Sequence, residues 1–255
     1  MRKFNFIFDK TKKAKTLKKV ILRNYKNYSP KNAEVIIVSG GDGFMLKTIK
    51  KFNKFKKPFY GINCGSIGFL LNKYITKKIE HKIQKAKTIQ INPLQIITRS
   101  KGNRRNVFLA INELSLLRQS KQTALLKLNA NKKILIKKLV GDGVMISTPA
   151  GSTAYNLSVN GPILSLNSKH VAITPISPFR PRRWKGKIIS DRTNINIINL
   201  DPQKRPVAAV ADNNEIRNVI SVSASVNKNI KIKLLFNPGE SLLKKIKSEQ
   251  KRKIS

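Results

Sequence analysis

Apolar residues in the first third of the chain follow two patterns. Short, continuous apolar runs predict strands at KFNFIF (3–8), EVIIVS (34–39) and PFYGIN (58–63). Between these runs, apolar residues recur at helical spacing and predict helices at 12–24, 44–55 and 75–86. Strands that alternate with helices are typical of βαβ units, so this part of the chain predicts an α/β, Rossmann-like N-terminal domain with a parallel sheet.

After Asn92-Pro93 the helical spacing stops, and short β-type segments follow one another with turn residues between them. These segments are LQIITRS (94–100), VFLAINELSLL (107–117), ALLKLNA (124–130), KILIKKL (133–139), GVMIST (143–148), TNINIINL (193–200), RPVAAVAD (205–212), ISVSASV (220–226) and NIKIKLLF (229–236). The pattern predicts a β-rich, β-sandwich-like second domain. We therefore expect the α/β domain at 1–92 and the β-rich domain at 93–235. An amphipathic segment at 241–253 predicts a last helix.

Composition narrows the protein class. The 255 residues are 40% hydrophobic, which is enough for a large buried core. The single cysteine, Cys64, cannot form an internal disulfide, and no Cys/His spacing typical of a metal site occurs. No apolar run approaches the roughly 20 residues of a membrane span, and the N-terminus lacks the features of a secretory signal. These observations predict a cytoplasmic protein with no membrane partner.

The net charge of +41 has two interpretations. A field of this size attracts polyanions, as in a nucleic-acid-binding protein. Alternatively, the sequence simply favours Lys, Asn and Ile throughout. The lysines are scattered along the whole chain and no nucleic-acid-binding motif occurs, so we favour the second interpretation and expect no specific nucleic-acid partner. The same field would attract anionic nucleotide substrates.

The segment VSGGDGFMLK (38–47) joins a predicted strand to a predicted helix through three glycines and Asp42. Such a turn can cradle a phosphate, because backbone N–H groups point outward at the positive end of a helix. Gly40 and Gly41 would let the backbone approach a phosphate closely and take positive φ. The alternative is a purely structural turn in which Asp42 caps the helix. This segment alone leaves the two interpretations equal.

Two further segments are candidates for ligand binding, with weaker sequence evidence. In GINCGSIGFL (61–70), Gly65 and Gly68 either form a second ligand-binding turn at the ends of the strands or only a tight connection. In AINELSLLR (110–118), Asn112 and Glu113 interrupt an apolar stretch. Burying these groups is costly without partners, so they either hydrogen-bond an adenine edge or ribose hydroxyls, or mark a solvated strand end.

The stretch at 140–164, VGDGVMISTPAGSTAYNLSVNGPIL, is crowded with small and polar residues around one aromatic residue, Tyr155. The polar part of this stretch is too polar for a core helix, and it directly follows an apparent strand at Met145 to Ser147. A loop of this kind offers many hydrogen-bond donors to a hydroxyl-rich ligand. We favour that interpretation over a simple Gly/Ser connector.

Taken together and in this order, the four segments resemble the NAD kinase family, whose members phosphorylate the 2′-hydroxyl of the NAD adenosine ribose. The shared motifs lie at 40–43 (GGDG), 61–70, 112–113 (NE) and 142–162 (DG followed by STPAGSTAYN). The resemblance extends from about residue 34 to at least residue 215. In the family the C-terminal tail returns to the first domain, so we expect 236–255 to return, with the active site between the domains.

The resemblance implies a role for each matching residue. Asp42 would be the general base, and the ATP phosphates would contact Gly40, Gly41 and Gly43, with Lys47 as a further phosphate or NAD contact. NAD would be held by Asn112, Glu113, Asp142, Thr153, Ala154, Tyr155, Asn156, Leu157 and Ser158, with Ser177 as a small residue beside the ligand. Mg²⁺ would enter as the ATP complex, although another divalent cation could replace it. A homodimer or homotetramer is also implied.

The chain departs from the family pattern at three positions. Phe44 stands where relatives commonly have Thr, Val140 where they often have a basic residue, and Asn214 where they often have Gln. The departures at Phe44 and Val140 raise a catalytically silent homologue as one alternative. A diacylglycerol-type lipid kinase, which shares GGDG, is a second, and a nucleic-acid-binding protein is the third.

Overall fold

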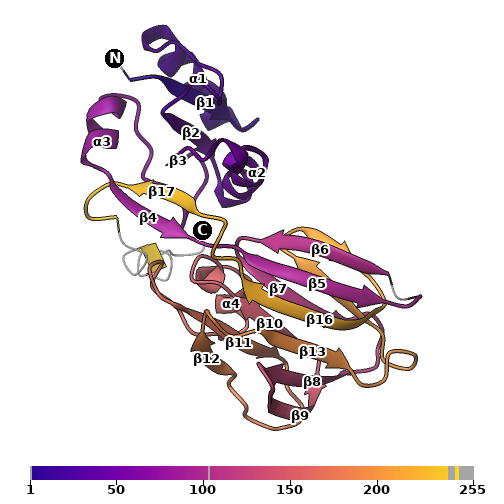
Figure 1. The fold of residues 1–255 in the computed structure, drawn as a ribbon. Coiled ribbons are helices and arrows are strands. Elements are labelled where there is room, and N and C mark those ends of the chain that lie inside the picture. Colours follow the sequence, from indigo (N-terminus) through magenta and orange to yellow (C-terminus); the bar gives the residue numbers. More distant parts are fainter. Residues whose placement is uncertain (1, 103, 241–244, 247–255) are drawn as a thin grey trace. The chain divides into compact units, whose positions relative to one another are not determined.

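The computed structural model describes residues 2–102, 104–240 and 245–246. The backbone divides into two compact units (Figure 1). Unit 1 comprises Met1–Ile91 and Lys231–Ser255, and unit 2 comprises Asn92–Ile230. The predicted combination of an α/β domain containing a parallel sheet and a β-rich domain is confirmed.

Unit 1 contains a five-stranded sheet in the order β1-β2-β3-β17-β4. Its strands are β1 (Phe4–Phe8), β2 (Val35–Gly40), β3 (Phe59–Asn63), β17 (Ile232–Phe236) and β4 (Lys87–Ile91). All neighbours are parallel except β17 and β4, which are antiparallel. The helices are α1 (Lys12–Asn24), α2 (Asp42–Phe52), the 3₁₀ helix η1 (Asn53–Phe55) and α3 (Ile79–Lys85).

Helix α1 illustrates how the local sequence determines where a helix begins and which face it buries. The Thr11 side chain caps the helix by accepting a hydrogen bond from the Ala14 amide at 3.3 Å. Ala14, Leu17 and Ile21 form its buried face, while the lysines between them are exposed. The buried face joins the core cluster that includes Phe4 of β1.

One predicted boundary is wrong. Residues 232–235 were assigned to the β-rich domain, but with Phe236 they form β17, which pairs with β3 and β4 in unit 1. Its alternation of buried Ile232 and Leu234 with exposed Lys233 fits either sheet, and the partner strands are remote in sequence. Of the helix predicted at 241–253, only Lys245 and Ile246 are described, and both are helical; the rest lies outside the described residues.

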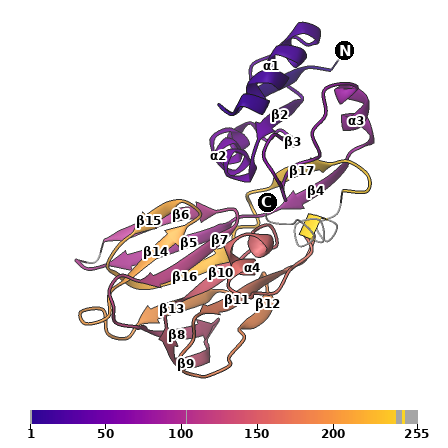
Figure 2. The ribbon, with the colours of Figure 1, turned by 180° about the vertical axis from the view of Figure 1, so that it is seen from behind.

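Unit 2 consists of two six-stranded antiparallel sheets. One has the order β12 (Lys187–Ser190), β11 (His170–Ile176), β10 (Gly143–Ser147), β7 (Glu113–Arg118), β14 (Val207–Ala211) and β15 (Asn214–Ile216). The other has the order β6 (Arg105–Ala110), β5 (Leu94–Ser100), β16 (Val219–Val226), β13 (Ile195–Asn199), β8 (Ala124–Ala130) and β9 (Lys133–Gly141). One apolar core takes side chains from both sheets, including Leu116 and Val144 from the first and Leu126 and Val222 from the second. Figure 2 shows β14, β7 and β10 of the first sheet from behind.

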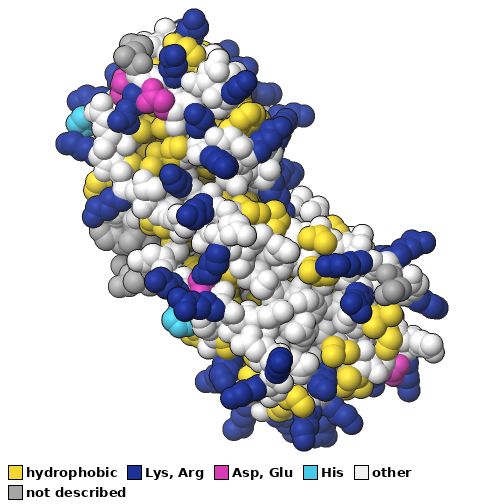
Figure 3. All heavy atoms as spheres, viewed as in Figure 1, with side chains coloured by type: hydrophobic (Ala, Val, Ile, Leu, Met, Phe, Trp, Pro, Cys, Tyr) yellow, Lys and Arg dark blue, Asp and Glu magenta, His cyan; other side chains and the backbone are white. Residues whose placement is uncertain are grey.

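Two short helices, η2 (Gly151–Thr153) and α4 (Tyr155–Ser158), follow β10. The surface drawn in Figure 3 has Lys and Arg side chains distributed over both units, with few acidic side chains among them. This distribution agrees with the scattered lysines of the sequence.

Asn72 is a buried polar residue that connects distant parts of unit 1. Its Nδ2 donates to the carbonyls of Gly61 in β3, at 3.1 Å, and Leu235 in β17, at 2.9 Å. Its Oδ1 accepts from the Asn237 amide at 2.8 Å. One amide group therefore links the returning strand to the loop after β3.

We expect Asn72→Ala to lower the free energy of unfolding by about 2–4 kcal/mol, because buried backbone groups lose their partners. Chemical denaturation measures the change. Asn32→Ala, at an exposed position of the same unit, is the matched control and should change stability by less than about 0.5 kcal/mol. Equal effects of the two substitutions would contradict the linking role.

Candidate functional site

The GGDG turn directly connects β2 to α2. Strand β2 ends at Gly40, Gly41 is the N-cap, and Asp42 is the first helical residue. The cap is therefore Gly41 and not Asp42. The carboxylate of Asp42 lies in the first turn, where the helix dipole favours negative charge. None of the motif's glycines, Gly40, Gly41 or Gly43, has positive φ, so that expectation was wrong.

The glycines differ in the space around them. A Cβ atom placed on Gly40 would lie 2.7 Å from Cδ1 of Phe44, so the Phe44 ring packs against this glycine. Cβ atoms on Gly41 and Gly43 would meet no atom within 4 Å. The departure at Phe44 therefore has a structural explanation in the packing of the turn, while Gly41 and Gly43 leave open space beside the helix N-terminus. Lys47 is exposed on α2.

The Asp42 carboxylate is held by the second glycine-rich turn. Its Oδ2 accepts from the Phe69 amide at 2.7 Å, and its Oδ1 accepts from the Leu70 amide at 2.9 Å. Burial raises the pKa of Asp42, while these two hydrogen bonds and the charge of Lys245 oppose the increase. The structure thus brings the predicted segments 38–47 and 61–70 together around one carboxylate.

Close packing fixes the second turn. The Cys64 amide donates to the Gly40 carbonyl at 2.9 Å, and the Gly65 amide donates to Asn63 Oδ1 at the same distance. A Cβ atom on Gly68 would lie 2.7 Å from Leu71 Cδ1, so glycine is needed there for packing. The backbone that carries the two amides bound to Asp42 is therefore well constrained.

In unit 2, the backbone around Asn112 and Glu113 is held by Asp212. The Asp212 carboxylate accepts from the Ile111 and Asn112 amides, both at 2.9 Å, and from the Glu113 amide at 3.4 Å. Thr148 binds the opposite side of this backbone, donating from Oγ1 to the Ile111 carbonyl at 2.7 Å. This arrangement fixes the position of the NE dipeptide.

The side chains of the NE dipeptide remain incompletely bonded. Asn112 Oδ1 and Glu113 Oε2 are buried and have no hydrogen-bond partner in the described part of the chain. Burial, reinforced by the neighbouring charge of Asp212, raises the pKa of Glu113 to about 8. Buried polar atoms are normally satisfied, so orphaned oxygens on adjacent residues are unusual and leave hydrogen-bonding capacity unused at this point of unit 2.

The STPAGST turn packs directly on the NE dipeptide. A Cβ atom on Gly151 would lie 2.3 Å from the Asn112 carbonyl oxygen, so glycine is required there. The Thr148 amide donates to the same oxygen at 2.9 Å. Two motifs that are separated in the sequence therefore form one surface of unit 2.

The residues predicted to bind NAD, in α4 and in the turn before it, differ in exposure. Tyr155 and Ser158 are exposed, and Ala154 and Leu157 are partly buried. Thr153 and Asn156 are buried. The Asn156 amide donates to the Pro162 carbonyl at 3.0 Å, and its Oδ1 accepts from Thr174 Oγ1 at 2.7 Å. Both ends of the Asn156 side chain are thus bonded within the protein.

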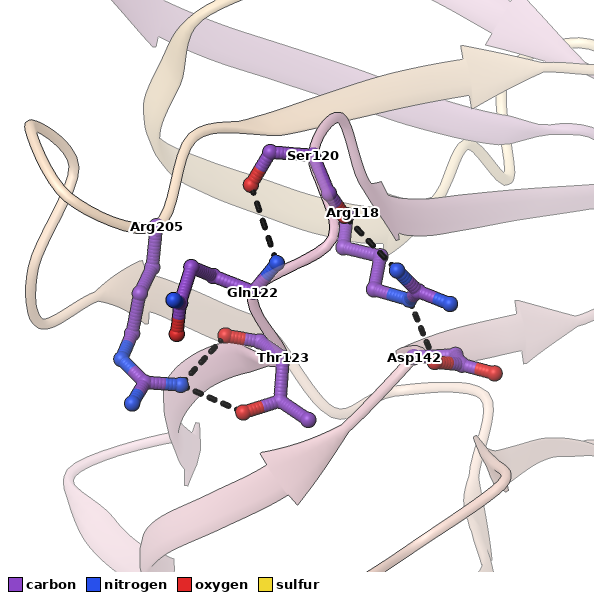
Figure 4. A network of polar contacts seen from close by, with 6 residues as sticks. All are labelled: Arg118, Ser120, Gln122, Thr123, Asp142 and Arg205. Atoms are coloured by element: carbon purple, nitrogen blue, oxygen red, sulfur yellow. Dashed lines mark hydrogen bonds and ion pairs between the residues drawn. The ribbon is translucent and has the colours of Figure 1, made fainter.

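Asp142 forms an ion pair that Figure 4 shows from close by. Arg118 Nε lies 2.5 Å from Asp142 Oδ1, and Arg118 Nη1 donates to the Ser120 carbonyl at 2.7 Å. Ser177 is exposed with φ 45°, and a Cβ atom on Gly141 would lie 2.9 Å from its carbonyl oxygen. Asp142 directly follows β9 and Ser177 directly follows β11, and the Asp142 amide donates to the Ile176 carbonyl at 2.9 Å, so the two residues lie close together.

The remaining departures lie in the same unit. The Val140 amide donates to the Arg180 carbonyl at 2.7 Å, so its backbone is paired with the segment that follows β11. Asn214 is exposed at the start of β15, opposite Ala211. Nothing in these positions disturbs the NE dipeptide or its supports.

Sequence reasoning missed two residues that position the site in unit 2, Asp212 and Thr148. Asp212 entered the sequence analysis only as the last residue of the segment 205–212; it lies in the turn that directly follows β14, with φ 53°, a conformation that Asp tolerates better than most residues. Thr148 precedes a proline, and nothing in the local sequence indicates that its side chain hydrogen-bonds to Ile111. Their partners are distant in sequence, so spacing alone could not have revealed them.

The described residues contain neither a cluster of metal-binding side chains nor a helix that could span a membrane. No group of three or more His, Cys, Asp or Glu side chains in the described ranges could hold a metal ion. No helix in the part of the chain that the structure describes is long and apolar enough to cross a bilayer.

Comparison with known proteins identifies the family. Residues 2–89 match the ATP-NAD kinase N-terminal domain, and residues 111–234 match the ATP-NAD kinase C-terminal domain. The chain is 41% identical to an NAD kinase of Zymomonas mobilis, over 98% of this chain and 99% of the relative. The chain belongs to the ATP-NAD kinase family. An NAD kinase of Xylella fastidiosa is 42% identical over 96% of this chain and 94% of its own.

Solved structures agree at the level of the fold. A yeast NADH kinase complexed with NADH has a TM-score of 0.76 at 23% identity, covering 90% of this chain and 70% of its own. An NAD kinase from Archaeoglobus fulgidus, in complex with ATP, has a TM-score of 0.73 at 20% identity, covering 96% of this chain and 99% of its own. The predicted family resemblance is confirmed, and the lipid kinase and nucleic-acid-binding alternatives find no support.

The Glu113 carboxyl group predicts a pH-dependent stability. Because its pKa is raised from 4.5 to about 8 in the folded state, folding favours the protonated form, and stability falls as the pH rises between these values. We expect Glu113→Gln to remove this loss, so that the variant gains stability relative to the parent with rising pH. Urea unfolding across this range measures the difference.

The matched control is Glu215→Gln, at an exposed position of β15 paired with Arg217 at 3.1 Å. It should keep the pH dependence of the parent. A constant difference between Glu113→Gln and the parent at every pH would show that Glu113 does not titrate as described.

Proposed function

We propose that this protein transfers the γ-phosphate of ATP to the 2′-hydroxyl of the NAD adenosine ribose, producing NADP and ADP. The observation that carries the proposal is Asp42, a carboxylate held by two backbone amides at the open N-terminus of α2. Family membership makes NAD and ATP the substrates to expect, because the curated relatives are NAD kinases over nearly their full length.

Asp42 would act as the general base. One carboxylate oxygen would take the proton of the ribose 2′-hydroxyl as the hydroxyl oxygen forms its bond to the γ-phosphorus and ADP leaves. Burial raises the pKa of Asp42, which makes it a stronger base than an exposed aspartate. The bonds from Phe69 and Leu70 fix the direction of the carboxylate, so little reorganisation is needed during the transfer.

The ATP phosphates would lie at the N-terminus of α2. The open space beside Gly41 and Gly43, together with the positive end of the helix dipole, supports phosphate binding there. Gly40 contributes differently, since it accommodates the Phe44 ring. The exposed Lys47 would contribute charge from the next turn of α2. Mg²⁺ would enter with ATP as part of the substrate, neutralising charge on the phosphates.

NAD would bind through unit 2. The orphaned Asn112 Oδ1 can accept a hydrogen bond, and Glu113 can donate one when protonated, which suits ribose hydroxyls and an adenine edge. Exposed Tyr155 offers an aromatic face. Further contacts would come from Ala154 at the N-cap of α4, from Leu157 and Ser158 on α4, and from Asp142 and Ser177.

Thr153 and Asn156 would act indirectly. Both are buried, and Asn156 bonds the turn to Pro162 and Thr174. We therefore propose that they hold α4 in position for its exposed residues to bind NAD. An assembly of two or four identical subunits, and action in the cytoplasm, remain proposals from the family resemblance. The exposed apolar side chains of Val107 and Leu109 on edge strand β6 agree with a subunit interface.

The base role of Asp42 is tested by Asp42→Asn. We expect the parent to convert NAD to NADP with Mg-ATP, and the variant to lose roughly 10²–10⁴-fold in kcat, the usual contribution of a general base. An NADP-specific dehydrogenase measures the product. Asp201→Asn, where the amide oxygen can still accept from the Lys204 amide, is the matched control. Equal rates for Asp42→Asn and the parent would remove Asp42 from this role.

The phosphate role of Gly43 is tested by Gly43→Ala. Because alanine fits the helix better than glycine and meets no protein atom, we expect stability to rise by about 0.5–1 kcal/mol. The added methyl group would occupy space needed by ATP, so KM for ATP should rise, by roughly tenfold if contacts worth 1.4 kcal/mol are lost. Steady-state kinetics and thermal unfolding measure the two effects.

Gly61→Ala provides the contrast, because its Cβ would lie 2.3 Å from Leu71 Cδ2 and 3.2 Å from the Leu71 backbone. That variant should lose stability. If Gly43→Ala binds ATP as well as the parent does, the phosphates lie elsewhere.

A further inference from the structure

Lys245 lies on the far side of the segment that holds Asp42. Its Nζ donates to the Phe69 carbonyl at 3.1 Å and to the Leu71 carbonyl. The ammonium also lies 5.1 Å from the centre of the Phe236 ring, at the end of β17. Lys245 is partly buried, so its charge is held by these groups and is not fully solvated.

The backbone of residues 69–71 is therefore hydrogen-bonded both through its amides and through its carbonyls. Its amides, from Phe69 and Leu70, donate to the Asp42 carboxylate at 2.7 and 2.9 Å. Its carbonyls, from Phe69 and Leu71, accept from Lys245. The Phe69 carbonyl and the Leu70 amide belong to one peptide group, so a cation at this carbonyl polarises the amide that donates to Asp42, and the two hydrogen bonds strengthen one another.

Burying part of a lysine has a cost that the surrounding groups must offset. Desolvation lowers the pKa of Lys245, while the negative charges of Glu240 and Asp42 oppose that change. Lys245 and Glu240 line a cavity of about 220 Å³ in unit 1, together with Asn63, Gly68, Asn72 and Lys73. An apolar side chain would fill the same position without this cost, so the charge itself needs an explanation.

We propose that Lys245 is a positioning residue for Asp42, holding the segment 69–71 so that its two amides fix the carboxylate. The inference rests on the proposed function and deepens it, because it assigns a task in catalysis to the chain that returns after unit 2. The sequence did not single out Lys245, which is one of many lysines near the C-terminus. In the described part of the chain, its bonds to Phe69 and Leu71 and its contact with Phe236 distinguish it.

The positive charge of Lys245 also acts on Asp42 directly. It opposes the increase in the pKa of Asp42 that burial causes. Among the described residues, the other charged groups that line the same cavity as Lys245 are Glu240 and Lys73. Loss of the Lys245 charge should raise the pKa of Asp42 further, so the acid limb of the kcat profile should move to higher pH.

Lys245→Met tests the inference, with Lys245→Arg as the variant that keeps charge and donors. We expect Lys245→Met to lower kcat by roughly tenfold or more, as for a displaced catalytic group, and to leave KM for ATP nearly unchanged. Its acid limb should shift to higher pH, and Lys245→Arg should recover most of the activity. Lys233→Met, at an exposed position of β17, is the matched control and should behave as the parent.

A second measurement does not depend on catalysis. With ¹⁵N-labelled Phe and Leu, hydrogen exchange of the Phe69 and Leu70 amides should be faster in Lys245→Met than in Lys233→Met, while the other labelled amides of unit 1 stay unchanged. This outcome would also show that the variant is folded. General acceleration of exchange, or unchanged protection of both amides, would overturn the inference.

The two proposals fail in different ways. If the parent makes no NADP, the proposed function is wrong, and the exchange measurement still decides whether Lys245 holds the segment. If the parent is active but Lys245→Met has the kcat and pH profile of the parent, only the positioning role is wrong.

Discussion

The hydrogen bonds from the Phe69 and Leu70 amides to Asp42 are the interaction on which the arrangement of unit 1 depends. They explain why two glycine-rich turns follow neighbouring parallel strands, β2 and β3, since one turn supplies the carboxylate and the other the amides. The two sets of glycines have different structural roles. Gly61 and Gly68 allow Leu71 to pack closely, whereas Gly41 and Gly43 leave space open.

Unit 2 uses a carboxylate in a related but opposite way. Asp212 also accepts from consecutive amides, those of Ile111, Asn112 and Glu113. There the aspartate supports the backbone, and the neighbouring side chains of Asn112 and Glu113 keep buried oxygens without partners in the described part of the chain. In unit 1 the backbone supports the aspartate. A motif search that scores only residue types would treat the two aspartates alike, and hydrogen-bond geometry separates them.

The sequence was sufficient for those features that depend on local patterns. Apolar runs and helical spacing predicted β1, α1, β2, α2 and β3, because each element has its own periodicity and its own end signals. The order of four motifs identified the family. Strand β17 was placed in the wrong domain because alternating Ile232, Lys233 and Leu234 fit any half-buried sheet. Strand pairing over such a separation is decided by the whole fold.

The same distinction applies to the site. Asp42, Asn112 and Glu113 were found because they interrupt glycine-rich or apolar stretches. The residues that hold them, Thr148, Asp212 and Lys245, carry no local signal, since their partners lie far away in the sequence. Exposure also had to come from the structure, which separates buried Asn156 from exposed Tyr155 within one motif.

As the proposed general base, Asp42 would face the hydroxyl group to be phosphorylated. A crystal structure of the Asp42→Asn variant with NAD and Mg-ATP bound tests this geometry. We expect the side-chain oxygen of residue 42 to lie about 2.6–3.2 Å from the 2′-oxygen of the adenosine ribose. A 2′-hydroxyl bound out of reach of residue 42, with another side chain in contact with it, would show that Asp42 is not the base.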